Sequence, residues 1–154
     1  MQIIDAQIHL WAGASAPPHH WRAPYTVENA LRDMDEAGVD RAVNCPAIWD
    51  AGANDYVEAA ERYPERFATL GRFPLDDAAD ESLVDAWLDK PGMVGLRFVM
   101  AAPETAGRLA SGTLDWLWEA ADRRGMAVGI MVMPPYLPAG RSSTRSVPSG
   151  CSGY

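Results

Sequence analysis

Apolar positions in this chain switch between strand-like runs and helix-like spacing from the first residues onward. Residues 3–11 form an apolar run that predicts a buried strand. After a loop over residues 12–25, apolar residues recur at helical spacing over residues 27–37. Thr26 precedes this segment as the predicted N-cap, and Gly38 follows it where a helix ends in a left-handed residue. The first part of the chain therefore predicts a strand, a loop and a capped helix.

The same alternation continues to residue 133. Apolar stripes at helical spacing predict three further helices, separated by short strands at intervals of about 30 residues, which is typical of β-α-β units. The strands are predicted at residues 40–46, 66–73, 93–99 and 126–133, and the helices from Asn54 to Pro64, at residues 83–88 and at residues 114–121, the last closed by Gly125. This order predicts parallel strands joined by right-handed crossovers.

Two architectures fit parallel strands covered by helices: an open doubly wound sheet, or part of a (β/α) barrel. A dinucleotide-binding doubly wound fold carries a Gly-rich phosphate loop after its first strand, and no such loop follows residues 3–11. A complete barrel needs about 250 residues, whereas this chain has 154. The sequence therefore predicts an α/β fold: a partial (β/α) TIM-type barrel with five parallel strands and four helices over residues 1–138.

The composition changes abruptly near Pro138. Asp122 is the last acidic residue, and residues 140–154 are largely Ser, Gly, Arg, Thr and Pro without an apolar pattern. Such a composition is typical of disorder, so we expect residues 139–154 to form an irregular, disordered tail. Two origins stay open: a native flexible tail, or a frameshift product that replaces the second half of the barrel.

The net charge of the chain is −8, from 13 basic and 21 acidic residues. Nucleic acids and anionic membranes are bound by clustered Lys and Arg, so neither is an expected partner. No apolar run approaches the roughly 20 residues of a membrane span, and no basic region precedes the first strand as in a signal peptide. The two cysteines, Cys45 and Cys151, lie far apart and do not form a disulfide framework. We therefore expect a cytoplasmic protein.

The first strand carries polar residues at alternate positions, namely Asp5, Gln7 and His9. Alternate residues of a strand share a face, so these three side chains are predicted to point the same way. Polar groups on a buried strand are costly unless they are used. This pattern indicates a site at the mouth of the barrel near His9. The alternative is a strand end at which His9 only hydrogen-bonds to the backbone.

Arginines stand where the predicted third and fourth strands end, at Arg72 and Arg97. Barrel enzymes build their sites at this end of the strands, and a guanidinium can hold a carboxylate through two parallel hydrogen bonds. Trp49, which follows the second strand, is placed to line the same pocket. For either arginine, the alternative is an ion pair with a nearby Asp or Glu that only supports the structure.

Four segments together resemble one family. Residues 3–11, 38–43, 63–67 and 94–98, in this order and spacing, are similar to the amidohydrolase superfamily, and within it to the amidohydrolase-related TIM-barrel metal-dependent hydrolases. The branch in question includes dicarboxylate lactone hydrolases and metal-dependent decarboxylases. The resemblance covers residues 1–138 and implies the N-terminal half of such a barrel.

The resemblance also implies a divalent metal, zinc, in an intact family member, and the chain departs from the family at this point. The family begins with Asp-x-His-x-His, but Gln7 stands in place of the first His, so only His9 remains as a weak metal ligand. The fifth strand, at residues 130–133, lacks the metal-binding His of many relatives. The family's later His and Asp would lie beyond the break near residue 138. We therefore expect no metal in this chain.

The resemblance implies a hydrolase that acts on a small carboxylate-bearing ester, lactone or amide by attack of water on the carbonyl. His9 is the expected catalytic residue. The expected substrate-binding residues are Gln7, Arg97, Arg72 and Trp49. Because the later-strand residues of the family are absent, we expect the chain to be inactive alone. Two alternatives stay open: a decarboxylase on the same scaffold, or a non-enzymatic half-barrel that forms homo-oligomers through its open edges.

Overall fold

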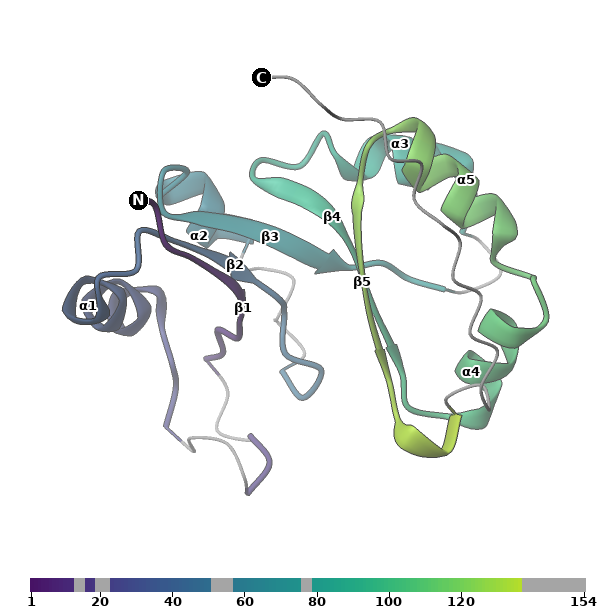
Figure 1. The fold of residues 1–154 in the computed structure, drawn as a ribbon, viewed down its shortest axis with the longest axis horizontal. Helices are drawn as coiled ribbons and strands as arrows, with labels where there is room; N and C mark the ends of the chain where they lie inside the picture. Colours follow the sequence, from purple (N-terminus) through teal and green to yellow (C-terminus); the bar gives the residue numbers. More distant parts are fainter. Residues whose placement is uncertain (13–15, 19–22, 51–56, 76–78, 137–154) are drawn as a thin grey trace.

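A computed structural model describes residues 1–12, 16–18, 23–50, 57–75 and 79–136 of the chain. Within these residues, five parallel strands follow one another in the order β1-β2-β3-β4-β5 and curl into a half-barrel (Figure 1). The strands are β1 (Ile4–Ile8), β2 (Arg41–Asn44), β3 (Phe67–Arg72), β4 (Met93–Met100) and β5 (Ala127–Val132). The predicted α/β fold class is thereby confirmed.

Helices connect consecutive strands and cover one face of the sheet (Figure 1). They are α1 (Val27–Ala37), α2 (Val57–Arg62), α3 (Glu81–Trp87), α4 (Pro103–Ala110) and α5 (Asp115–Arg123), followed by the 3-10 helix η2 (Pro134–Tyr136). Among the described residues, none of these helices combines the length and the apolarity that crossing a membrane requires.

The predicted caps of the first helix are confirmed. The side chain of Thr26 accepts a hydrogen bond from the backbone N–H of Asn29, and the side chain of Asn29 accepts one from the backbone N–H of Thr26. At the other end, Gly38 has a φ of 71°, a left-handed conformation that only glycine adopts without strain. These local signals fix α1 between β1 and β2.

The described part of the chain has five α-helices where the sequence predicts four. The additional helix, α4, begins with Pro103 at its first turn, and the hydroxyl of Thr105 bonds to the backbone of Ala102. None of its residues is fully buried, and its apolar residues Ala106 and Leu109 pack against the core only in part. A helix that buries little surface gives little periodic signal.

The prediction that the first strand is buried is wrong. β1 lies at one edge of the sheet, and its residues from Ile4 to Gln7 are exposed; the side chain of Ile4 is 53% accessible. An edge strand has a neighbour on one side only, and in this sheet β1 pairs with β2 alone. Its apolar residues therefore stay in contact with water.

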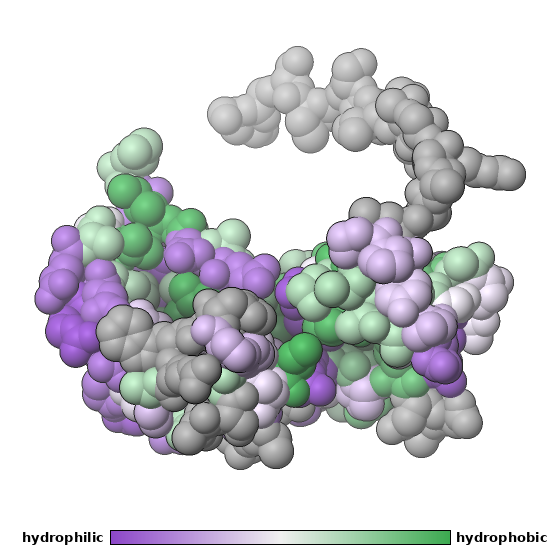
Figure 2. Space-filling view, turned by 90° about the horizontal axis from the view of Figure 1, so that it is seen from below, coloured by the Kyte–Doolittle hydropathy of each residue, from purple (hydrophilic) through white to green (hydrophobic). Residues whose placement is uncertain are grey.

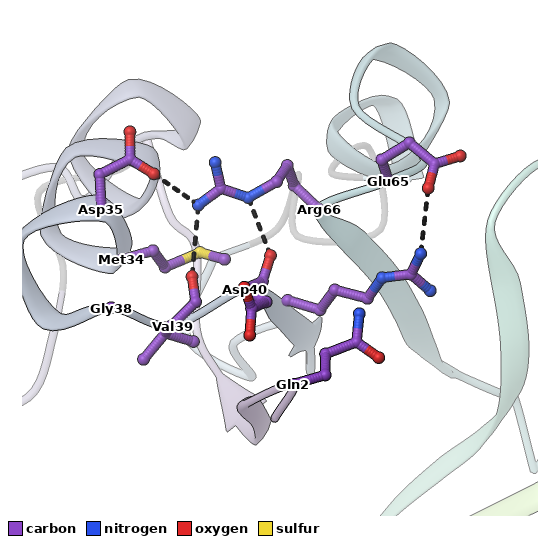
Figure 3. A pocket seen from close by; sticks show the side chains of 9 residues that line it. Gln2, Met34, Asp35, Gly38, Val39, Asp40, Glu65 and Arg66 are labelled. Carbon is purple, nitrogen blue, oxygen red and sulfur yellow. Dashed lines mark hydrogen bonds and ion pairs between the residues drawn. The ribbon is translucent and has the colours of Figure 1, made fainter.

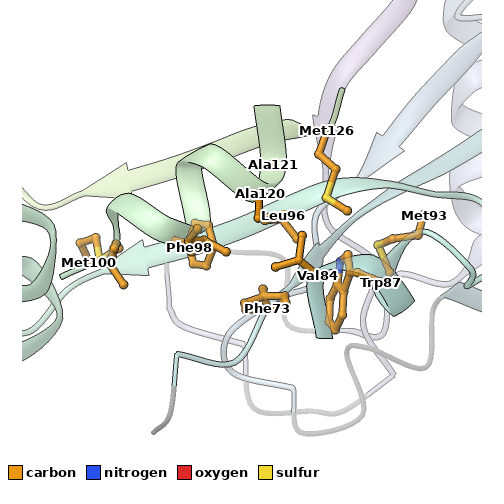
Figure 4. Close-up of a cluster of buried hydrophobic side chains, with 12 residues drawn as sticks. Phe73, Val84, Trp87, Met93, Leu96, Phe98, Met100, Ala120, Ala121 and Met126 are labelled. Carbon is orange, nitrogen blue, oxygen red and sulfur yellow. The ribbon is translucent and has the colours of Figure 1, made fainter. Parts of the chain in front are cut away.

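Two separate hydrophobic clusters lie between the sheet and the helices. One packs α1 and α2 on β2 and the start of β3; its buried residues are Leu10, Val27, Ala30, Met34, Ala42, Ala59, Ala60 and Phe67. The other packs α3 and α5 on β4 (Figure 4); its buried residues are Phe73, Val84, Trp87, Met93, Leu96, Phe98, Met100, Leu114, Leu117, Ala120, Ala121 and Met126. The core thus sits entirely on the helix side of the sheet.

At the end of the sheet where the strands begin, Arg66 links α1 to the start of β2 (Figure 3). Its guanidinium forms an ion pair of 2.7 Å with Asp35 at the end of α1, and it donates to the backbone oxygens of Asp40 (2.9 Å) and Val39 (3.3 Å). These residues line a polar hollow of about 480 Å³, in which Arg66 is paired with Asp35 and Arg41 with Glu65. Seen from below, the strongly hydrophilic residues gather mainly on the side of the molecule where α1 lies, at the left of Figure 2. In barrels, this end of the strands serves stability.

Tyr25, which packs against the cluster of α1, α2 and β2, provides a test of the packing there. The Tyr25 hydroxyl donates to Asp33 (2.9 Å), and burial together with that bond raises the pKa of Tyr25 to about 12. Because the folded-state pKa lies above the unfolded value, the neutral phenol adds stability below pH 10, and this contribution is lost as the pH rises through 12. Titration of the absorbance of the phenolate, with Tyr25→Phe as the reference, should show this late step. Asp33→Ala should move the step toward the ordinary pKa of tyrosine; an unchanged step would contradict the role of Asp33.

Candidate functional site

A hollow of about 310 Å³ opens at the carboxyl ends of the strands, a volume at the lower end of the range of ligand pockets. Residues from the ends of β1 and β5, at the two edges of the sheet, both line it, because the sheet curls. The lining residues are His9, Pro17, Pro46, Ile48, Trp49, Arg97, Val99, Met131 and Met133. The hollow is largely apolar, with one imidazole and one guanidinium as its ionisable groups.

His9 is oriented by the backbone that follows β2. Its Nδ1 lies 2.6 Å from the carbonyl oxygen of Cys45. A carbonyl oxygen only accepts hydrogen bonds, so Nδ1 carries the hydrogen and, in the neutral ring, Nε2 is a proton acceptor. The ring also meets the indole of Trp49 edge to face, with centroids 5.6 Å apart. His9 therefore bonds to the backbone and also lines the hollow.

Arg97 lies on the inner face of β4, beside Arg72 of β3 and Gly129 of β5, its partners in register. A Cβ atom at Gly129 would lie 2.5 Å from Cδ2 of Leu70, which is too close, and in ordinary contact, at 3.5 Å, with Cδ and Nη1 of Arg97; the missing side chain therefore makes room for Leu70. Arg72 and Arg97 also line a second hollow, of about 230 Å³, which extends toward Thr105 of α4. Two half-buried cations thus lie side by side at the carboxyl ends of the strands.

Within the described part of the chain, neither Arg72 nor Arg97 forms an ion pair or a hydrogen bond, so the alternative of a structural ion pair does not hold for either. The other described arginines all have such partners: Arg32, Arg41, Arg62, Arg66, Arg108, Arg123 and Arg124. Adjacent cations that lose hydration without a counter-charge are unfavourable. An anionic ligand would supply that counter-charge.

Gln7 does not join this hollow. The pairing of β1 with β2 shifts register between Asp5 and Ile8, so the strict alternation that would place Asp5, Gln7 and His9 on one face is interrupted. Gln7 is exposed, and its backbone N–H donates to the Asp5 carboxylate (3.0 Å). The structure brings together His9, Trp49 and Arg97, places Arg72 in the adjoining hollow, and leaves Gln7 outside both.

Two residues of the site were missed by sequence reasoning. Asn44, at the end of β2, is fully buried, and its side-chain oxygen accepts from the backbone N–H of Leu10 (3.3 Å), which fixes the chain just after His9. A polar residue inside an otherwise apolar strand is the signal that could have found it. Gly129 is the other: it is the partner of Arg97 in register, and a side chain there would overlap Leu70. A glycine within an apolar strand is a signal of such close approach.

Cys45 is buried, and burial raises the pKa of its thiol although the nearby Arg97 charge lowers it. A protonated, enclosed thiol is not a nucleophile. Its role at the site is the backbone carbonyl that holds His9.

The side chains at the hollow do not fit a metal ion. Zinc sites in proteins use three or four imidazole, thiolate or carboxylate ligands, whereas the hollow offers the single imidazole of His9 beside the cationic Arg97. In the described ranges, no group of three or more His, Cys, Asp or Glu side chains is arranged to hold a metal.

Comparison with solved structures identifies the architecture. A probable 2-pyrone-4,6-dicarboxylic acid hydrolase from Acinetobacter baumannii, with citric acid bound, is similar over 88% of this chain and 51% of its own, with a TM-score of 0.64 and 19% identity. The apo structure of the Agrobacterium tumefaciens protein ATU3138 is similar over 83% of this chain and 47% of its own, with a TM-score of 0.57 and 20% identity. No protein-family model and no curated protein matches the chain. The chain therefore shares the fold of these structures and spans about half their length.

Proposed function

We propose that this chain carries the carboxylate-recognition part of a hydrolase site, for a small carboxylate-bearing ester, lactone or amide. The observation that carries the proposal is that His9 and Arg97, which has no ion-pair partner among the described residues, line one hollow at the carboxyl ends of the strands. One structure of the same fold is a probable hydrolase of a dicarboxylic acid and has citric acid bound, which supports the same class of substrate.

Recognition is assigned to the two arginines. A carboxylate that accepts two parallel hydrogen bonds from Arg97 gains charge-assisted bonds and relieves the repulsion between Arg97 and Arg72. The apolar side of the hollow, formed by Trp49, Met131 and Met133, accommodates the rest of a small planar or cyclic acid. A substrate held by its carboxylate at Arg97 extends toward His9.

Because the chain is expected to be inactive alone, the reaction is proposed for a complete barrel that contains this half, and in it His9 acts as general base. A water molecule attacks the substrate carbonyl carbon and gives its proton to Nε2, which the bond from Nδ1 to the Cys45 carbonyl keeps in the accepting form. The C–O or C–N bond of the ester, lactone or amide then breaks, and the leaving oxygen or nitrogen takes up the proton. The products are a carboxylic acid and an alcohol or amine.

Binding is the first test, because the hollow supplies only His9 and Arg97 as ionisable groups among the described residues. Isothermal titration with citrate and with 2-pyrone-4,6-dicarboxylate should detect binding, and neutral 2-pyrone should bind much more weakly. Arg97→Met should weaken binding of the dicarboxylates by about tenfold or more, since hydrogen bonds to charged groups contribute about 1.5–3 kcal/mol.

The matched control is Arg41→Met, because Arg41 pairs with Glu65 at the opposite end of the sheet. It should leave the affinity unchanged. Equal binding of the neutral pyrone, or an equal loss in both variants, would overturn the proposal. Turnover by the chain alone is not expected. If pyrone absorbance is nevertheless lost, ring opening indicates the hydrolase, whereas release of carbon dioxide would assign the decarboxylase instead.

A further inference from the structure

Among the described residues, β5 pairs with β4 alone and forms one edge of the sheet, and it has no charged residue. Its residues pair with β4 in regular register, from Gly95 with Ala127 to Met100 with Val132, and no bulge interrupts the ladder. The segment 127–133 is Ala-Val-Gly-Ile-Met-Val-Met and contains neither charge nor proline. Val128 and Ile130, which share one face of the strand, are 37% and 39% exposed. A long, regular, apolar edge of this kind is a template for pairing with another strand.

The other edge of the sheet is protected against such pairing. β1 carries the charged Asp5, and its register shifts between Asp5 and Ile8. Both a charge and a bulge are devices by which edge strands discourage association. Although Ile4 is exposed there, the distortion of β1 makes it a poor partner for a regular strand.

From this asymmetry we infer that β5 pairs with β5 of a second copy of the chain, antiparallel about a twofold axis. A twofold interface brings each surface against itself, and a strand without charges meets no like-charge repulsion when it faces its own copy. With the axis at Gly129, Val128 of one copy lies opposite Ile130 of the other. The sheet then continues through both copies, and four exposed apolar side chains become neighbours.

Each copy offers only its β5 edge for this pairing. Once two copies have paired through β5, neither has a further edge of this kind, so assembly ends at the dimer. Pairing of β5 with β1 of another copy would be head-to-tail, and could continue into larger rings or filaments. The bulge and the charge of β1 oppose that arrangement. The proposal is independent of the hydrolase function, since it needs no ligand in the hollow.

Sedimentation velocity over a wide concentration range tests the inference with the whole chain. We expect wild type to approach twice the mass of the 16.7 kDa chain. Ile130→Lys, and separately Val128→Lys, should raise the dissociation constant of the dimer by about tenfold or more, because each dimer would then hold two lysines near the axis. Ile4→Lys, at an exposed position of the other edge, is the matched control and should leave the dimer intact.

Circular dichroism establishes that each variant is folded, and hydrogen exchange gives a second readout. In wild type, amide protection in residues 127–133 should rise with protein concentration, whereas protection in β1 should not. A monomeric wild type at all concentrations would overturn the inference. So would a dimer that survives both β5 variants, a dimer lost in Ile4→Lys, or assemblies larger than two copies.

Discussion

Replacing Leu96 by alanine should destabilise the fold by about 2–5 kcal/mol, out of a total of about 5–15 kcal/mol for a domain of this kind. Leu96 lies on the helix side of β4 with none of its surface exposed, within the cluster that joins α3 and α5 to the sheet. Truncation removes buried methyl groups and leaves a cavity that Trp87 and Leu117, both held by their own packing, cannot fill.

Urea denaturation followed by tryptophan fluorescence measures this loss. Val94→Ala is the matched control, because Val94 lies two residues earlier on the same strand and is 41% exposed. It should change the free energy of unfolding by no more than about 0.5 kcal/mol. If Leu96→Ala cost no more than Val94→Ala, the cluster between β4 and the helices would not be the stabilising core.

Gly95→Ala should cost about 1–3 kcal/mol or more, and should loosen β5. The added Cβ would overlap the backbone carbonyl oxygen of Ala127, its partner in register, and would also press on Leu70. The Leu70 side chain can rotate away from the added Cβ. The carbonyl of Ala127 belongs to the backbone of β5 and can move only if β5 moves with it. Since β5 pairs with β4 alone in the described sheet, relief of the clash means displacement of β5.

A glycine-to-alanine substitution at another position, Gly107, should stabilise the fold instead of destabilising it. Gly107 lies in α4, and a Cβ there would meet no atom within 4 Å. Gly107→Ala should therefore stabilise by about 0.5–1 kcal/mol through helix propensity. Thermal unfolding of both variants by circular dichroism makes the comparison. Equal effects of the two substitutions would show that β4 and β5 do not approach each other closely at Gly95.

The sequence was sufficient for the architecture because the alternation of strands and helices is strong and local. The caps of α1, Thr26 and Gly38, were predicted from residue type alone and are confirmed. The exposure of β1 was not predictable in the same way, because Ile4 and Ile8 are apolar whether the strand lies at an edge or in the middle of a sheet. α4 escaped prediction because it has no buried stripe.

Prediction of the candidate site was limited by register. The alternation rule grouped Gln7 with His9, but a shift in strand pairing, which no local residue announces, separates them. The adjacency of Arg72 and Arg97 likewise depends on how β3 and β4 align. Sequence position did indicate that both arginines stand at strand ends. That neither has an acidic partner among the described residues could be learned only from the fold.

The division of the core into two clusters has a consequence for cooperativity. β3 runs from one cluster to the other: its first residue, Phe67, belongs to the first cluster, and Phe73, which follows its last residue, belongs to the second. Each cluster, with the helices that cover it, therefore resembles a separate folding unit. β3 is the strand that connects the two units. Local openings of such units follow their own free energies. The carboxyl-terminal unit can thus open while α1 and its strands stay folded, and the hollow, whose walls come from both units, exists only while both are closed.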